Sequence, residues 1–106
     1  MNHAEMMRKA IRQVGGEVCL INKENRTNFI ASIQPKFSEA RDISDIDGYS
    51  APVGYVLYAP ADAPPMAVGN TIETKHSRYA ITQCETAYLF GEPLYYHALL
   101  REEEEL

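Results

Sequence analysis

The chain has 106 residues, of which 45% are hydrophobic and 24% are charged, a size and composition typical of one soluble domain with a single modest core. No apolar run approaches the roughly 20 residues of a membrane-spanning helix, and no cluster of Lys and Arg is present to neutralise phosphates, which disfavours tight nucleic-acid binding. The formal net charge is -5, and four consecutive glutamates at 102–105 predict an acidic, solvated tail over residues 102–106.

The first predicted element is a helix within residues 1–15. Four apolar residues recur at spacings of three or four and form one stripe: Ala4, Met7, Ile11 and Val14. The pair Gly15-Gly16 is expected to end the helix, because glycine readily takes the left-handed conformation found at many helix C-termini. A helix this short is marginal alone, so we expect it to dock on the rest of the domain.

From residue 17 onward the apolar pattern becomes that of strands. Strands are predicted at 18–21, 28–34, 53–58, 71–75, 79–89 and 94–101, with short turns at 22–25, 76–78 and 90–93. Pro35 is expected to close the second strand. One helix and about six strands predict a mainly β (α+β) fold: a small antiparallel β-barrel or sandwich with an N-terminal helix. We expect a single domain over 1–106, with the barrel at 17–101.

Two stretches interrupt this pattern, at 35–52 and at 59–66. The first has no clear period, and loops this long in compact domains are usually functional or disordered. We expect it to be mobile in the isolated chain, because its few apolar residues cannot offset the entropy of ordering it. The second carries three prolines that stiffen it.

The sequence contains no complete catalytic or metal-binding motif. The run Asp45-Ile46-Asp47-Gly48 fails as a calcium loop, because Ile43 and Gly54 stand where ligands are needed. The histidines and cysteines are not spaced as metal ligands usually are: His3, His76, His97, Cys19 and Cys84. There is no nucleophile elbow or glycine-rich phosphate loop. We therefore expect no enzyme, cofactor or metal, and we expect both cysteines to pack in the core.

The last predicted strand carries apolar bulk on both faces. Its core face is expected to present Leu94, Tyr96, Ala98 and Leu100. Its other face presents Tyr95, His97, Leu99 and Arg101. Two interpretations remain open at this point. Either the strand lies between the barrel and the N-terminal helix, or these four residues form a subunit interface, where Tyr and Arg are favoured.

The segment 68–101 contains three short motifs built on glycine, tyrosine and apolar residues. It begins with Val68-Gly69-Asn70-Thr71-Ile72, continues with Arg78-Tyr79-Ala80-Ile81 and Gly91-Glu92-Pro93-Leu94-Tyr95, and ends in an apolar strand with a terminal arginine. With these motifs the chain resembles, over nearly its full length, the small neck proteins encoded in the late operons of tailed phages. It looks most like the XkdH-type group of PBSX-like defective prophages of Bacillus.

This resemblance implies a structural role in head completion or head–tail joining. Such proteins form a ring between the portal or adaptor complex and the tail, and DNA passes through the ring without specific binding. The first residues lack a secretory signal, so the expected location is the bacterial cytoplasm and then the neck of a phage or phage-like particle, with no membrane contact.

In such a ring, the loop 35–52 is expected to project toward the channel or an adjoining ring. Its candidate assembly residues are Asp42, Asp45, Asp47 and Tyr49, and the three carboxylates would repel phosphate rather than bind it. The alternative function is a small-ligand or single-strand-binding barrel of OB type. That function needs aromatic residues interleaved with Lys and Arg on one sheet face; the tyrosines are present but the basic partners are not.

Overall fold

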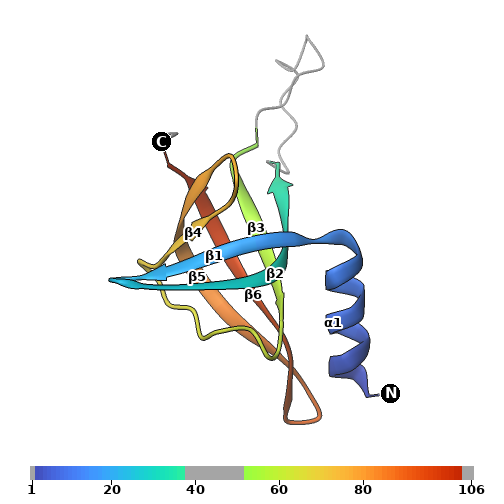
Figure 1. Cartoon of the computed structure of the whole chain (residues 1–106). Coiled ribbons are helices and arrows are strands. Elements are labelled where there is room, and N and C mark those ends of the chain that lie inside the picture. The colour runs from blue at the N-terminus through green and yellow to red at the C-terminus, as the bar shows by residue number, and fades with distance from the viewer. Residues whose placement is uncertain (1, 38–51, 104–106) are drawn as a thin grey trace, which may run out of the picture.

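The computed structural model describes residues 2–37 and 52–103 and confirms a mainly β fold with one N-terminal helix (Figure 1). The elements are α1 (His3–Val14), β1 (Gly16–Asn22), β2 (Asn25–Lys36), β3 (Gly54–Pro60), β4 (Thr71–Glu73), β5 (Arg78–Leu89) and β6 (Glu92–Glu102). The long-loop residues 38–51 lie outside the described part of the chain.

The six strands close into an antiparallel barrel in the order β1-β2-β3-β6-β5-β4. The short strand β4 completes the circle by pairing with both β1 and β5. The longest pairing joins β5 and β6, from Tyr79 opposite Glu102 to Leu89 opposite Glu92. Of the two predicted architectures, the structure is therefore the barrel, in which closure gives each strand two neighbours.

Alternate residues of every strand point into the barrel and form its core. The buried set is Val18, Leu20, Ala31, Leu57, Ala59, Ala63, Ile72, Tyr79, Ile81, Ala98 and Leu100, of which Ala63 comes from the connection after β3. Half-buried Tyr55 packs edge-on against Tyr79, with ring centroids 5.1 Å apart. Burying a large apolar side chain contributes about 1.5–3 kcal/mol, so this set supplies the main driving force for folding.

Helix α1 lies on the outside of the barrel and packs against β2, β3 and β6 (Figure 1). Asn2 caps its start, where the side-chain Oδ1 accepts a hydrogen bond from the Glu5 amide at 2.8 Å. Ile11 is the buried residue of the helix, and it is not part of the barrel-core cluster. Val14 is 71% exposed, so the predicted apolar stripe ends one turn earlier than expected.

Gly15 ends the helix for a different reason from the one predicted. Its backbone is extended (φ -95°, ψ -177°) rather than left-handed, and its amide donates to the Ile11 carbonyl at 2.8 Å. A Cβ at this position would lie 2.5 Å from the Ala31 carbonyl oxygen. Glycine is required because the chain passes this close to the backbone of β2.

Most strand boundaries differ from the predicted ones by one or more residues, and three of these differences are informative. Pro35 does not close the second strand, because β2 continues to Lys36 and Pro35 pairs opposite Tyr55. The last strand begins at Glu92, so the turn before it contains only Phe90 and Gly91. The strand predicted at 71–75 stops at Glu73, because Thr74 begins a turn in which its amide donates to the Ser77 carbonyl at 2.8 Å.

Candidate interaction surface

The outer face of β6 carries the four residues singled out as a possible interface. Tyr95, His97 and Leu99 are half-buried on this face, and Arg101 continues it as an exposed residue near the strand end. Between them Ala98 and Leu100 point inward, where they are 0% and 3% exposed. The strand therefore alternates, with Ala98 and Leu100 inside the barrel and Tyr95, His97 and Leu99 outside.

Pairing with β3 builds an aromatic group on this outer face. Tyr58 lies directly opposite His97, and Tyr95 is two residues earlier on β6. The ring centroids are 6.0 Å apart for Tyr58 and Tyr95, 6.5 Å for Tyr58 and His97, and 6.2 Å for Tyr95 and His97. We call Tyr58, Tyr95 and His97 the tyrosine–histidine cluster. Aromatic pairs at such distances attract one another by about 0.5–1.5 kcal/mol beyond their burial.

The neighbouring strands extend this cluster in two directions. On β5, Glu85 lies opposite His97, and its Oε2 is 3.3 Å from His97 Nε2. On β3, half-buried Val56 lies opposite Leu99. The cluster together with Val56 and Leu99 forms the outer apolar strip, the name used below for these five residues. The strip is partly exposed to solvent: the His97 side chain keeps 33% of its accessible surface.

The structure leaves both interpretations of this strand face open. Helix α1 packs against β2, β3 and β6, and the strip lies on the last two of these strands. The strip residues nevertheless remain only half-buried. The helix therefore covers part of this side of the barrel, and an apolar surface is left over beside it.

Tyr58 and Glu85 were not singled out in the sequence. Tyr58 did carry a local signal, because it lies between the inward-pointing Leu57 and Ala59 and so had to point outward. What could not be read is that β3 pairs with β6 and places Tyr58 beside His97. The other candidate residues, Asp42, Asp45, Asp47 and Tyr49, lie outside the described residues, as does the run rejected as a calcium loop.

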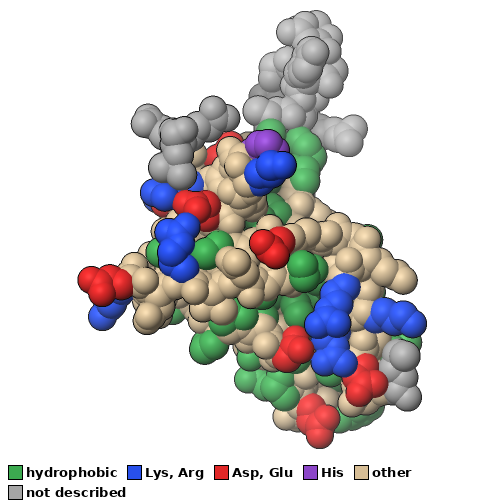
Figure 2. All heavy atoms as spheres, viewed as in Figure 1, with side chains coloured by type: hydrophobic (Ala, Val, Ile, Leu, Met, Phe, Trp, Pro, Cys, Tyr) green, Lys and Arg blue, Asp and Glu red, His purple; other side chains and the backbone are tan. Residues whose placement is uncertain are grey.

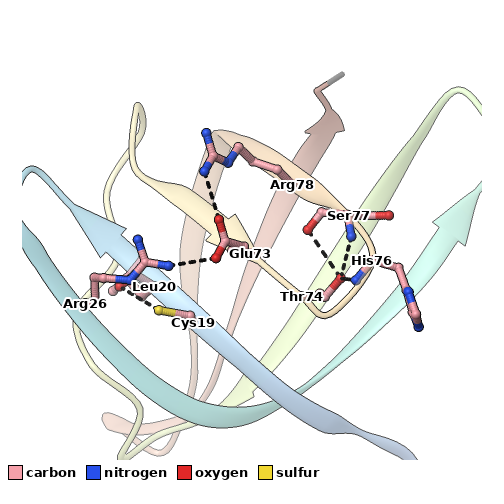
Figure 3. Close-up of polar contacts among 8 residues, drawn as sticks. All are labelled: Cys19, Leu20, Arg26, Glu73, Thr74, His76, Ser77 and Arg78. Atoms are coloured by element: carbon pink, nitrogen blue, oxygen red, sulfur yellow. Dashed lines mark hydrogen bonds and ion pairs between the residues drawn. The ribbon is translucent and has the colours of Figure 1, made fainter. Parts of the chain in front are cut away.

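A polar feature lies across β2, β4 and β5. Glu73 accepts hydrogen bonds from two arginines, at 2.7 Å from Arg26 Nη2 and 2.8 Å from Arg78 Nη2 (Figure 3). The hydrogen bond from Arg78, aided by Arg26, holds the pKa of Glu73 below its ordinary value. The carboxylate thus ties β2, β4 and β5 together at the closure of the barrel. The adjacent open groove is polar, lined among others by Glu17, Asn28 and Lys75.

The stability of the protein should therefore fall as Glu73 gains a proton. A carboxyl whose folded-state pKa is depressed stabilises the fold above its unfolded pKa, and this contribution is lost as the pH falls. Below about pH 5, the melting temperature of the wild type should fall more steeply than that of Glu73→Gln, when both are followed by circular dichroism. The exposed turn variant Glu24→Gln is the control and should follow the wild type. Parallel curves for all three proteins would contradict the coupling.

The cysteines only partly match their expected place in the core. Both are free and half-buried. Cys84 packs against the core cluster, and its Sγ lies 3.5 Å from the Met66 carbonyl oxygen. Cys19 instead lies between the inward-pointing Val18 and Leu20 and faces the polar groove. The expectation of two core cysteines is therefore wrong for Cys19, because strand alternation places it outside.

Among residues 2–37 and 52–103, no group of three or more His, Cys, Asp and Glu side chains could hold a metal ion. In the same part of the chain, no helix is long and apolar enough to cross a membrane. Comparison with known proteins adds no assignment. No protein-family model, curated protein or solved structure matches the chain.

Proposed function

We propose that this chain is a structural, non-catalytic subunit in the neck of a tailed phage or phage-like particle. In this role it joins head and tail, or completes the head, as part of a ring between the portal or adaptor complex and the tail. The observation that carries the proposal is the outer apolar strip, a second apolar face beside the one that fills the barrel. The resemblance of segment 68–101 to phage neck proteins supports the same role.

The composition of the strip favours a protein contact over a nucleic-acid contact. Tyrosine and aliphatic side chains dominate it, and the charged residues beside it are Glu85, 3.3 Å from His97, and Arg101 near the strand end. A single-strand-binding face would instead interleave aromatic rings with Lys and Arg. A ring that lets DNA slide through also needs no basic surface that binds phosphate.

The amount of surface suits a contact that forms during assembly. Five half-buried side chains at one barrel face offer less area than the roughly 800 Å² per partner of a standard stable complex. Subunits of this kind associate weakly alone and are held in place by a template that presents several contacts at once. The portal complex would supply that template.

Replacing Tyr95 and Leu99 with serine tests this proposal. Both side chains point away from the core, so the double variant should keep the strand spectrum of the barrel in circular dichroism. In a phage or prophage that depends on this gene, it should leave filled heads without tails, or heads that lose DNA, as counted by electron microscopy. The loss of completed particles should reach tenfold or more, because aromatic anchors at contacts each contribute about 2 kcal/mol or more.

Two control variants make the result decisive. Tyr96→Ser with Leu100→Ser changes the same strand on its inward face and should unfold the protein. Val68→Ser changes a side chain that is 63% exposed away from the strip and should leave assembly intact. If the Tyr95/Leu99 variant unfolds as well, the strip stabilises the fold by packing against α1 and is not a partner contact. If it folds and particles are completed normally, the neck proposal is wrong.

A further inference from the structure

The turn between β5 and β6 projects beyond the body of the barrel beside the start of α1 (Figure 1). At its tip the Phe90 side chain is 91% exposed, and Tyr88 nearby is 63% exposed. An aromatic ring in water contributes no burial energy to the fold. The fold therefore gives no reason for an aromatic residue at this tip.

The backbone conformation at the tip also disfavours phenylalanine. Phe90 and Gly91 have φ angles of 52° and 80°, and they form a two-residue turn between paired strands. Such turns favour Asn-Gly, because both central residues must take positive φ. A bulky residue in this region is an outlier, and strain of this kind persists mainly at functional sites. Phe90 is thus both exposed and strained.

The hairpin that carries the tip contributes a carboxylate, Glu92, to the surface beside it. Between Arg78 and Arg101 the sequence contains Glu85 and Glu92 but no Lys or Arg. The groove beside the tip is lined by Asn2, His3, Ala4, Leu89, Phe90, Glu92, Pro93 and Leu94. In Figure 2, hydrophobic and acidic side chains are seen at this lower end, with Lys and Arg side chains just above and beside them. A carboxylate at the tip disfavours contact with nucleic-acid phosphate and favours contact with a cationic group.

We propose that Phe90, supported by Tyr88, is a docking knob that inserts into an apolar pocket on a different protein, a pocket rimmed by Lys or Arg. Charge complementarity selects this occupant, because Glu92 is the one Asp, Glu, Lys or Arg among the described residues that line the groove beside the knob. A second copy is a poor match. Its groove at Arg26 and Lys75 also contains Glu17 and Glu73. Its groove at Arg8 also contains Glu5 and Asp62.

A photocrosslinker in place of Phe90 identifies the occupant. The full chain carrying p-benzoylphenylalanine at position 90 is produced in the cells that carry the gene, irradiated and analysed by mass spectrometry. The proposal expects one dominant protein adduct, mapped to an apolar segment flanked by Lys or Arg. The same crosslinker in place of Val68, which is 63% exposed on another loop, is the control and should not give that adduct. Adducts to the chain itself, or the same set from both positions, would overturn the proposal.

Two variants separate docking from folding. Phe90→Asn supplies the residue that the turn prefers, so its melting temperature should rise by about 4 °C or more. The same variant should bind the purified crosslinked protein about tenfold or more weakly. Glu92→Lys should weaken binding as well, because it reverses the charge at the rim. Unchanged affinity of both variants would rule out the knob.

A membrane surface is the competing occupant and has its own measurement. The chain contains no tryptophan, so Phe90→Trp places a single indole at the tip. Its emission should not shift on addition of phosphatidylcholine vesicles, with or without phosphatidylglycerol. A blue shift with either vesicle would show that the tip binds a lipid surface, which would contradict the proposed protein pocket. A crosslinked protein unrelated to phage necks would support the knob but argue against the neck proposal, so the two can fail separately.

Discussion

Replacing Leu57 with alanine should destabilise the protein by roughly 2–5 kcal/mol, the usual cost of removing a fully buried leucine. Leu57 is 0% exposed in the middle of β3 and pairs with Ile33 on one side and Ala98 on the other. A closed barrel cannot collapse easily around the resulting cavity, because every strand is held by two neighbours. A domain of this size has about 5–15 kcal/mol of stability in total, so the loss removes a large part of it.

Chemical denaturation with urea, followed by circular dichroism, measures this loss directly. Val56→Ala is the matched control, because Val56 is the adjacent residue on β3 and is only half-buried on the outer face. We expect the Leu57 variant to lose at least twice as much stability as the Val56 variant. Equal losses would show that the inner and outer faces of β3 contribute alike, which would contradict the barrel core.

The second large effect is expected from Gly15→Ala. The added Cβ would lie 2.5 Å from the Ala31 carbonyl oxygen and 2.7 Å from the Ile11 carbonyl oxygen. Both atoms belong to the backbone, so no side chain can swing away, and α1 has to move off β2. Losing the burial of Ile11 alone costs about 1.5–3 kcal/mol. The barrel should remain folded, because Ile11 is not part of its core cluster.

Limited trypsin digestion detects this displacement. Arg8, Lys9 and Arg12 lie on α1, so release of the helix should make cleavage there much faster. Gly16→Ala is the control at the next residue, where a Cβ would meet no atom within 4 Å, and its digestion should match that of the wild type. Similar digestion of both variants would mean that α1 is not seated against β2 as described. Since the φ of Gly15 is -95°, the effect is one of contact and not of backbone conformation.

The two proposed contacts lie on different parts of the molecule. The outer apolar strip is on the sides of β3 and β6, whereas Phe90 is at the turn between β5 and β6. One face can therefore contact a neighbour in a ring while the tip reaches a different component. The Tyr95/Leu99 and Phe90 experiments measure these contacts independently, because neither set of substitutions touches the other surface.

The sequence by itself determined which segments form strands and, where apolar and polar residues alternate, which residues of a strand point the same way. Alternation over 94–101 separated Ala98 and Leu100 from Tyr95, His97 and Leu99, and the structure buries the first two fully. The helix and its docking residue Ile11 were also readable, because a 3.6-residue period is a local property. Local patterns are sufficient for these features since each depends only on residues close in the chain.

Only the tertiary structure decided how these strands meet. No local pattern indicates that β3 pairs with β6, so the contact between Tyr58 and His97 could not be predicted. No local pattern indicates that β4 closes the barrel between β1 and β5, so the ion pairs of Glu73 with Arg26 and Arg78 could not be predicted either. The same holds for the extended conformation of Gly15, which depends on its distance from Ala31, 16 positions later in the chain. Strand pairing and close approach are set by the packing of the whole domain, and a pattern read along one segment does not contain them.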